Sequence, residues 1–225
     1  MTTSGRRILG FWVAAVVAGG LLAIAVQETL VPFLYYLVMR FAVSPSINTL
    51  NWAYGTIGLV VVVASAIAIA GPPAFVLGRR LGGIEIPWIV ASAVAALVAA
   101  VIPLSSWLMD WSSYLMGGPS VVIPLLYGVV AGCATGVAQA IVLRPYVRGV
   151  AWWIPASTFA GAIVNVALFL IRWQVAGGGM RTQTDTYFVE TVVGAVGWLI
   201  VGIVTGLVLV RLLGELDTER TRVVT

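Results

Sequence analysis

The sequence contains no histidine and no lysine, a single cysteine, and few charged residues of either sign. Without histidine, the chain offers no imidazole ligand for haem, zinc or copper and no imidazole general base. Without lysine, it lacks the phosphate-binding residue of a Walker A site and the amine of a Schiff base. Cys133 alone forms neither an internal disulfide nor a multi-thiolate metal site. These absences exclude several common classes of cofactor and catalytic centre.

Apolar residues dominate what is present. Of 225 residues, 61% are hydrophobic and only 9% are charged, and the mean hydropathy is +1.07. A soluble domain carries about 25% charged residues. The long apolar stretches favour helices over the alternating pattern of an outer-membrane barrel. The sequence therefore predicts an all-α integral membrane protein with one polytopic domain over residues 1–225.

Six stretches reach the length of about 20 apolar residues that a helix needs to cross the hydrocarbon. These predicted spans are 8–26, 53–77, 88–109, 121–143, 152–171 and 191–210. Residues 28–43 are also apolar but form a shorter stretch. They are interpreted either as an extension of the first helix beyond Pro32 or as a helix in the outer interface. Ala23-Ile24-Ala25 resembles a signal-peptide cleavage pattern, which leaves open whether the N-terminus is removed.

The arginines predict the orientation of these spans. Nine of them lie on the side of the termini: Arg6, Arg7, Arg79, Arg80, Arg144, Arg148, Arg211, Arg220 and Arg222. The opposite side receives Arg40, Arg172 and Arg181. Positive charge is enriched in cytoplasmic flanks, so both termini are predicted to be cytoplasmic. The net charge of +4 comes from these flanks and gives no indication of a nucleic-acid partner.

An internal repeat is indicated by short segments at equal spacing. Spans two, four and six end in Phe75-Val76-Leu77, Ile141-Val142-Leu143 and Leu207-Val208-Leu209, separated by 66 residues each time. Spans one, three and five begin with Trp12, Trp88 and Trp153. The pattern predicts three helical hairpins in a six-helix bundle with pseudo-threefold character. The alternative is that tryptophan and arginine simply favour membrane interfaces.

Small residues predict where the helices pack closely. Span four carries a glycine ridge and span six carries two more glycines at the same spacing; these residues are Gly128, Gly132 and Gly136, and Gly202 and Gly206. Lipid tails give no hydrophobic drive between helices, so small residues that allow close approach stabilise their contact. Spans four and six are therefore expected to be central. The ridges are interpreted as internal packing, with a homo-oligomer or another membrane protein as the alternative.

Four uncharged polar residues form the candidate polar pocket: Thr135, Gln139, Ser157 and Asn165. An amide is costly to leave unpaired in lipid, so Gln139 and Asn165 must face protein or a water-filled cavity. One interpretation is hydrogen bonding between spans four and five. The other is a pocket for a small molecule.

Ionisable residues are placed mainly outside the predicted hydrocarbon region. Glu28, Asp110, Arg172 and Glu190 lie at predicted outer ends among aromatic residues, where interfacial anchoring is expected. No nucleophile–base pair or paired carboxylates are recognisable. We therefore expect no enzyme, no catalytic residues, no metal and no cofactor; a lipid-modifying enzyme using Asp110 and Glu190 is the alternative.

Residues 132–165 resemble an uncharacterised group of bacterial polytopic membrane proteins. The group carries G-x-x-x-G-x-x-Q-x-x-x-L-[RK], a basic loop, and W-W-x-x-A-[ST]. The matching residues here are Gly132, Gly136, Gln139, Leu143, Arg144, Trp152, Trp153, Ala156 and Ser157. Ala140 departs from the group, which often has tryptophan there. The resemblance implies a bacterial cytoplasmic (inner) membrane and brings no assigned activity.

Besides the lipid-modifying enzyme, two functions are compatible with these observations. The first is a non-catalytic membrane protein that acts through helix–helix contacts as a subunit, assembly factor or interaction partner of a membrane complex. The second is a small-molecule carrier or substrate-binding membrane subunit with a polar pocket between spans four and five. The expected partners are the lipid bilayer and another membrane protein or a second copy of the chain.

Overall fold

The structure, a computed structural model, describes residues 3–41, 47–101, 121–177 and 183–224. It describes side chains for residues 5–41, 52–100, 121–170 and 191–214. Regular structure in these ranges is helical, which confirms the prediction of an all-α protein with several membrane-length helices. Asp110, Arg172, Arg181 and Glu190 fall outside the described side chains, as do Arg220 and Arg222.

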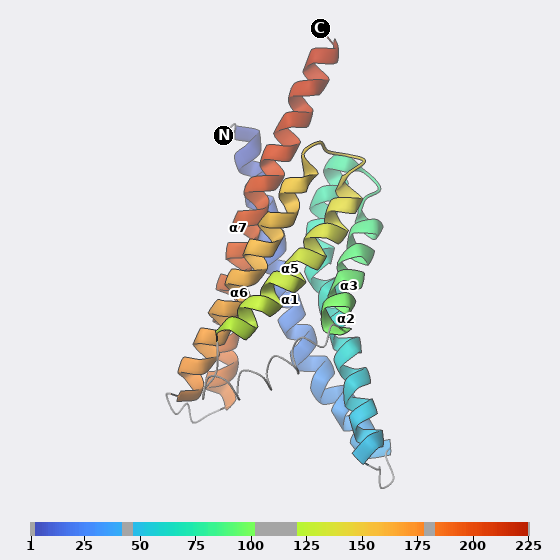
Figure 1. Ribbon diagram of the computed structural model, residues 1–225, viewed down its shortest axis with the longest axis vertical. Helices are drawn as coiled ribbons and strands as arrows, with labels where there is room; N and C mark the ends of the chain where they lie inside the picture. Colours follow the sequence, from blue (N-terminus) through green and yellow to red (C-terminus); the bar gives the residue numbers. More distant parts are fainter. Residues whose placement is uncertain (1–2, 42–46, 102–120, 178–182, 225) are drawn as a thin grey trace.

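Six long helices form the described part of the chain (Figure 1). They are α1 (Thr3–Phe41), α2 (Ile47–Leu81), α3 (Glu85–Val101), α5 (Val122–Leu143), α6 (Trp153–Gly177) and α7 (Gln183–Val224), with a 3₁₀ turn η1 (Val150–Trp152) before α6. Long apolar runs form helices because lipid offers no partner for free backbone groups. Five of the helices are long and apolar enough to cross a membrane. The described part of α3 has 17 residues, and residues 102–109 of its predicted span lie outside the described ranges.

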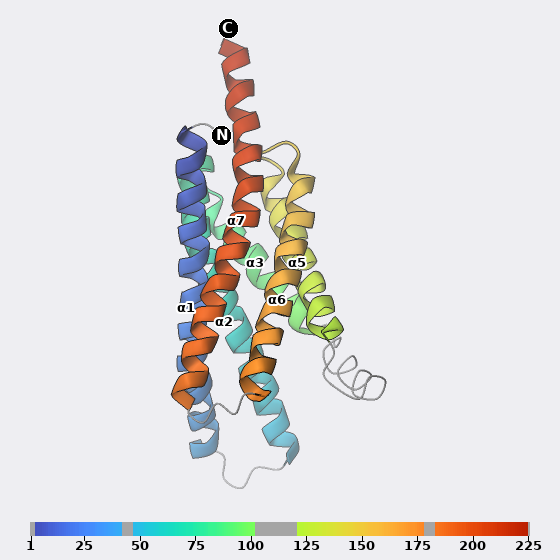
Figure 2. The same ribbon diagram turned by 90° about the vertical axis from the view of Figure 1, so that its left-hand side faces the viewer.

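Several helices are longer than the sequence pattern indicated, α1 and α7 most of all. α1 has 39 residues and continues through Pro32 to Phe41, so residues 28–41 extend the first helix. α7 has 42 residues and projects beyond the bundle at its C-terminal end (Figures 1 and 2). Hydropathy marks only the apolar part of a helix, whereas backbone hydrogen bonding also continues through polar flanks. The apolar runs therefore set a minimum length for each helix.

The helices are arranged as a ring in which each one packs against two neighbours. The neighbouring pairs are α1·α2, α2·α3, α3·α5, α5·α6, α6·α7 and α7·α1. α1 and α7 accordingly lie side by side although they stand at opposite ends of the chain (Figure 2). α5 and α7 occupy the same kind of position as the others, so the expectation that spans four and six are central was wrong.

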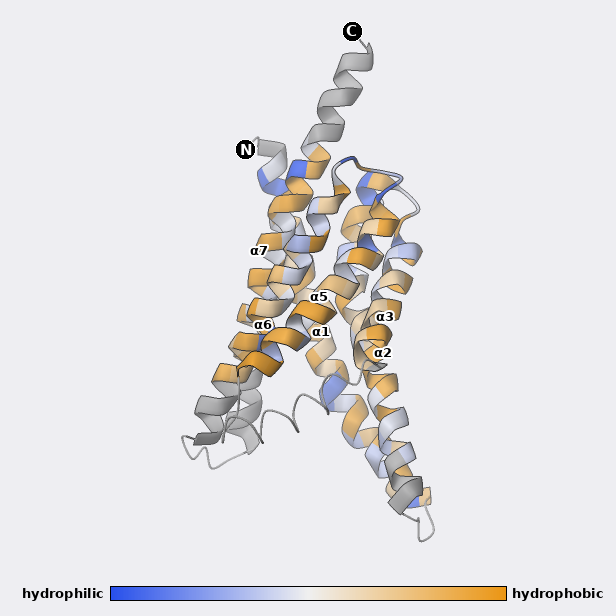
Figure 3. Cartoon of the chain, viewed as in Figure 1, coloured by the Kyte–Doolittle hydropathy of each residue, from blue (hydrophilic) through white to orange (hydrophobic). Residues whose placement is uncertain are grey.

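Polar segments gather at the end of the bundle that holds both termini (Figures 1 and 3). The turns between α2 and α3 and between α5 and α6 lie at this end. Gly82, Gly83 and Gly149 adopt positive φ of 67°, 68° and 69° in these turns, a conformation that glycine accepts without steric cost. From this end, α1 and α2 diverge from α6 and α7 (Figure 1).

The glycine ridges lie within the ring. A Cβ at Gly128 would overlap the backbone at Gly161, and one at Gly132 would overlap the backbone at Ser157. Gly136 meets α6 at Ile154. These contacts hold α5 and α6 at a distance that only glycine permits.

The α7 glycines play the same part toward α1. Gly202 packs on the backbone of Val13, and Gly206 packs on the side chains of Leu9 and Trp12. The five predicted ridge residues therefore form contacts within the chain. Three of them lie between α5 and α6, and two lie between α7 and α1.

Candidate functional site

Three tryptophans meet inside the ring. Trp12 of α1, Trp88 of α3 and Trp153 of α6 are each no more than 2% exposed. Their ring centroids are separated by 6.1 Å for Trp12–Trp88, 5.7 Å for Trp12–Trp153 and 5.7 Å for Trp88–Trp153, with interplanar angles of 80°, 78° and 68°. Edge-to-face contact places the positive ring edge on the negative face of the neighbour, which stabilises each pair. We call these three residues the tryptophan layer.

The tryptophan layer closes the ring toward the end that holds the termini. Leu77, Leu143 and Leu209 belong to the same buried cluster and are at most 1% exposed. They end the three repeated triplets, and each lies on α2, α5 or α7. Ile84 and Val147, from the two turns, complete this apolar plug.

Hydrogen bonds connect two of the tryptophans to neighbouring helices, Trp12 to α7 and Trp153 to α5. The Nε1–H of Trp12 donates to Thr205 Oγ1 at 2.9 Å, and Thr205 donates to the carbonyl of Val201 at 2.7 Å. The Nε1–H of Trp153 donates to Gln139 Oε1 at 3.0 Å. Most buried indole N–H groups in proteins have such an acceptor.

Gln139 also connects to α3. Its Nε2 donates to Ser92 Oγ at 2.9 Å, and Ser92 donates to the carbonyl of Trp88 at 2.9 Å. The amide therefore joins α5, α6 and α3. An amide group has two donors and two acceptor positions, so Gln139 retains one of each beyond these bonds.

Trp88 is the exception in the layer, because its Nε1 is buried with no hydrogen-bond partner. The acceptors for the other two indoles, Thr205 and Gln139, are 66 residues apart, and the same step back from Gln139 leads to Pro73. Pro73 is buried on α2 and its ring offers no acceptor. The third indole is thus unpaired, and the residue 66 positions before Gln139 is a proline.

A cavity of about 240 Å³ lies on the other side of the tryptophan layer. All six long helices contribute to its walls. The lining residues are Trp12, Val16, Ala66, Ile69, Ala70, Pro73, Trp88, Ser92, Ala96, Ala131, Gly132, Thr135, Gln139, Trp153, Ser157, Gly161, Val164, Asn165, Trp198, Val201 and Thr205. None of these residues is charged. We call this space the central cavity.

The structure brings the four predicted pocket residues together at the central cavity. Thr135 and Gln139 line it from α5, and Ser157 and Asn165 line it from α6. Gln139 makes the expected bond between spans four and five. Asn165 instead donates to the carbonyl of Gly161 in its own helix at 2.9 Å.

Two opposite walls of the central cavity differ in polarity. The α5–α6 wall carries the hydroxyls of Thr135 and Ser157 and the amides of Gln139 and Asn165. On the cavity side of the tryptophan layer, the α1–α2 wall consists of Val16, Ala66, Ile69, Ala70 and Pro73. A molecule in the cavity thus meets polar groups on one side and hydrocarbon on the other, as is common in binding sites.

Sequence reasoning missed the three tryptophans and two of the hydroxyls at this site. Trp12, Trp88, Trp153, Ser92 and Thr205 line the central cavity, but the tryptophans were interpreted as starts of spans, and neither Ser92 nor Thr205 was included in the predicted pocket. The 66-residue offset that aligns the triplets also aligns Thr205 with Gln139 in the sequence. Applying that offset to polar residues would have found Thr205.

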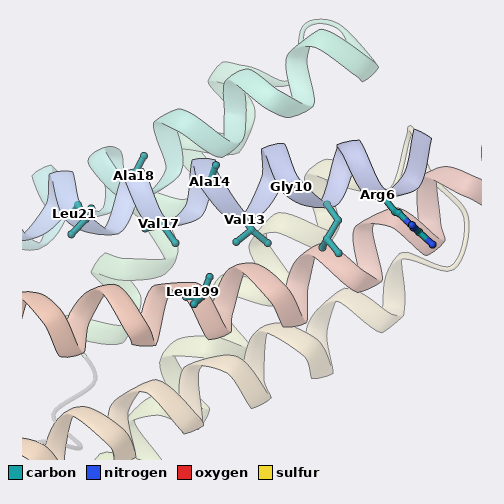
Figure 4. A pocket seen from close by; sticks show the side chains of 9 residues that line it. Arg6, Gly10, Val13, Ala14, Val17, Ala18, Leu21 and Leu199 are labelled. Atoms are coloured by element: carbon teal, nitrogen blue, oxygen red, sulfur yellow. The ribbon is translucent and has the colours of Figure 1, made fainter. Parts of the chain in front are cut away.

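A second hollow is an open groove on the outside of the ring (Figure 4). It follows α1 from Arg6 past Gly10, Ala14 and Ala18, and Leu199 of α7 borders it. Apart from Arg6, its walls are apolar. It therefore resembles a lipid-facing surface more than a polar binding site.

Comparisons with protein-family models, curated proteins and solved structures gave no significant match. Within the described residues, no group of three or more cysteine and acidic side chains is positioned to hold a metal ion.

Proposed function

We propose that this protein is a membrane-embedded binding protein or carrier for a small molecule, and that the central cavity is its binding site. The observation that carries the proposal is the convergence of Thr135, Gln139, Ser157 and Asn165 on one wall of a cavity lined by six helices. Concave, mostly apolar pockets with a few convergent polar groups are the usual form of small-molecule sites.

Unused hydrogen-bonding capacity supports binding over a purely structural role. Thr135 is half-buried and lines the central cavity, and within the described residues its hydroxyl has no hydrogen-bond partner. A hydroxyl that only joined helices would have a hydrogen-bond partner in the protein, because an unpaired hydroxyl away from water is destabilising. A bound molecule is the natural source of the missing partner.

A non-catalytic role is part of the proposal. The residues that line the central cavity include no acid, no base and no thiol. Amides and hydroxyls orient a ligand, whereas proton transfer or nucleophilic attack requires a titratable or activated group.

Mass spectrometry of molecules that accompany the purified chain tests the proposal. Ala131→Phe places an aromatic ring in the central cavity, and Val137→Phe places the same ring on the exposed side of the same helix. We expect a small molecule to be released from the wild type and Val137→Phe but not from Ala131→Phe. If all three preparations release the same molecules in equal amount, the central cavity is not the site.

We also propose three hairpin repeats in a cytoplasmic membrane of a bacterium, with both termini inside. The hairpins would be α1–α2, α3–α5 and α6–α7. Each indole bond then runs from one hairpin to another, from the first to the third and from the third to the second. The position of Pro73 opposite Trp88 would complete the cycle. Seven arginines with described positions at the end that holds the termini support the orientation.

A second candidate function is the role of subunit in a membrane complex. The specific observation is the exposed face of α1, where Gly10, Ala14 and Ala18 line the outer groove (Figure 4). A Cβ at Gly10 meets nothing within 4 Å, so another helix has room to approach. Native mass spectrometry in nanodiscs would detect a stoichiometric partner, and Ala14→Phe should release it.

A further inference from the structure

The charge and polarity of the central cavity narrow the class of molecule that it holds, and this inference rests on the proposed function. We propose that the ligand is an uncharged amphipathic molecule, with a hydrogen-bonding group such as a carboxamide on α5 and α6 and an apolar body against α2 and the tryptophan layer.

The absence of charge in the cavity walls supports the proposal that the ligand is uncharged. No acidic or basic side chain is among the residues that line the central cavity. Arg79, Arg144 and Arg211 follow the three plug leucines along α2, α5 and α7, away from the cavity. A charge at membrane depth requires a partner of opposite sign or water. A ligand with a net charge would find neither in these walls.

The unused hydrogen-bond donors and acceptors of the α5–α6 wall support the proposal of a hydrogen-bonding group on the ligand. Gln139 retains one donor and one acceptor after its bonds to Trp153 and Ser92. In the described part of the chain, no residue donates to Asn165 Oδ1 and none bonds to the Thr135 hydroxyl. Donors and acceptors are therefore both available, which suits a group that offers both.

The α1–α2 wall supports the proposal that the rest of the ligand is apolar. Val16, Ala66, Ile69 and Ala70 present only hydrocarbon to the cavity. Bonds to polar atoms of a ligand are impossible there, and an unpaired polar group would be destabilised. The ligand must accordingly be polar on one side only.

Benzamide, benzoate and benzamidinium test the proposal because they share a ring and differ in charge. Equilibrium dialysis against the full chain in nanodiscs, with empty nanodiscs subtracted, measures their binding. We expect saturable binding of one benzamide per chain and roughly 100-fold weaker binding of both ions, since an uncompensated charge costs that much within a membrane helix bundle. Ala131→Phe should abolish benzamide binding, and Val137→Phe should not.

The polar wall is tested by removing its groups singly. Thr135→Val and Asn165→Leu should each weaken benzamide binding about tenfold, as expected for one lost hydrogen bond. Thr158→Val is the matched control, because the Thr158 hydroxyl bonds to the Ile154 carbonyl and does not line the cavity. If neither wall variant changes the affinity, the assignment of this wall is overturned.

The outcomes separate this inference from the proposed function. If benzoate or benzamidinium binds as tightly as benzamide and Ala131→Phe prevents it, the ligand need not be uncharged, but the binding site stands. If none of the three probes binds saturably, the inference is overturned. The molecule recovered from the wild type by mass spectrometry then decides separately whether the proposed function fails as well.

Discussion

Gln139 accepts the indole N–H of Trp153 at 3.0 Å, and this bond ties α5 to α6 directly beside the central cavity. The same amide donates to Ser92 on α3 at 2.9 Å. One side chain thus fixes three helices around the site. Its removal would affect both the stability of the ring and the shape of the cavity.

Gln139→Leu should destabilise the protein by about 1–3 kcal/mol, because it leaves the buried N–H of Trp153 without an acceptor. Thermal or denaturant unfolding in a mild detergent measures the change. Gln27→Leu is the matched control, since Gln27 is exposed on α1. Equal effects of the two substitutions would show that the bond to Trp153 contributes nothing.

Pro73→Gln should stabilise the protein by about 1 kcal/mol, because in the proposed repeat this position corresponds to Gln139 and glutamine there would offer the acceptor that Trp88 lacks. Pro72→Gln removes the neighbouring helix proline without reaching the same position, so it separates the new bond from relief of the proline itself. The comparison is made by unfolding both variants under identical conditions.

The gain from Pro73→Gln should also depend on Trp88. In a Trp88→Phe background the indole N–H is absent, so the added glutamine has no donor to accept from and the gain should disappear. A gain that persists in that background would contradict the assigned pairing.

Gly132→Ala should destabilise the protein by about 1–3 kcal/mol, because its Cβ would overlap the backbone of α6 at Ser157 and force the helices apart. Gly71→Ala on α2 is the control. A Cβ there meets nothing within 4 Å, and alanine favours the helix by up to about 1 kcal/mol. Unfolding midpoints should therefore move in opposite directions, and a shift of both in one direction would argue against close packing at Gly132.

The orientation is testable with single cysteines in a Cys133→Ala background. Pro145→Cys lies in the exposed turn after α5, and Met39→Cys lies near the opposite end of α1. We expect a membrane-impermeant maleimide to label Met39→Cys in intact cells and Pro145→Cys only after permeabilisation. The reverse pattern would place both termini outside.

The sequence predicted the existence of the helices better than their contacts. Apolar length identified where each of the six helices lies, since lipid leaves the backbone no alternative to helix. It did not show which face of a helix turns inward, because lipid-facing and protein-facing sides are both apolar. Exposed Ile141 and buried Leu143, only two residues apart, illustrate the difficulty.

The polar residues were the better guide to the site. Gln139 and Asn165 were identified because amides cannot face lipid, and both line the central cavity. The tryptophan layer was not foreseen, since Trp12 and Trp88 carry no signal that distinguishes a buried ring from an interfacial anchor. Pairing Trp12 with Thr205, 193 residues away, requires knowledge that the first and last helices are neighbours.

That pairing also determines when the central cavity can exist during synthesis. α1 leaves the ribosome long before α7, and until α7 is inserted the indole N–H of Trp12 cannot donate its hydrogen bond to Thr205. The inner face of α1 is then open to lipid, because the ring closes only through contact between α1 and α7. The central cavity is thus a late product of membrane insertion, and a chain stopped before its last helix lacks one of the six walls.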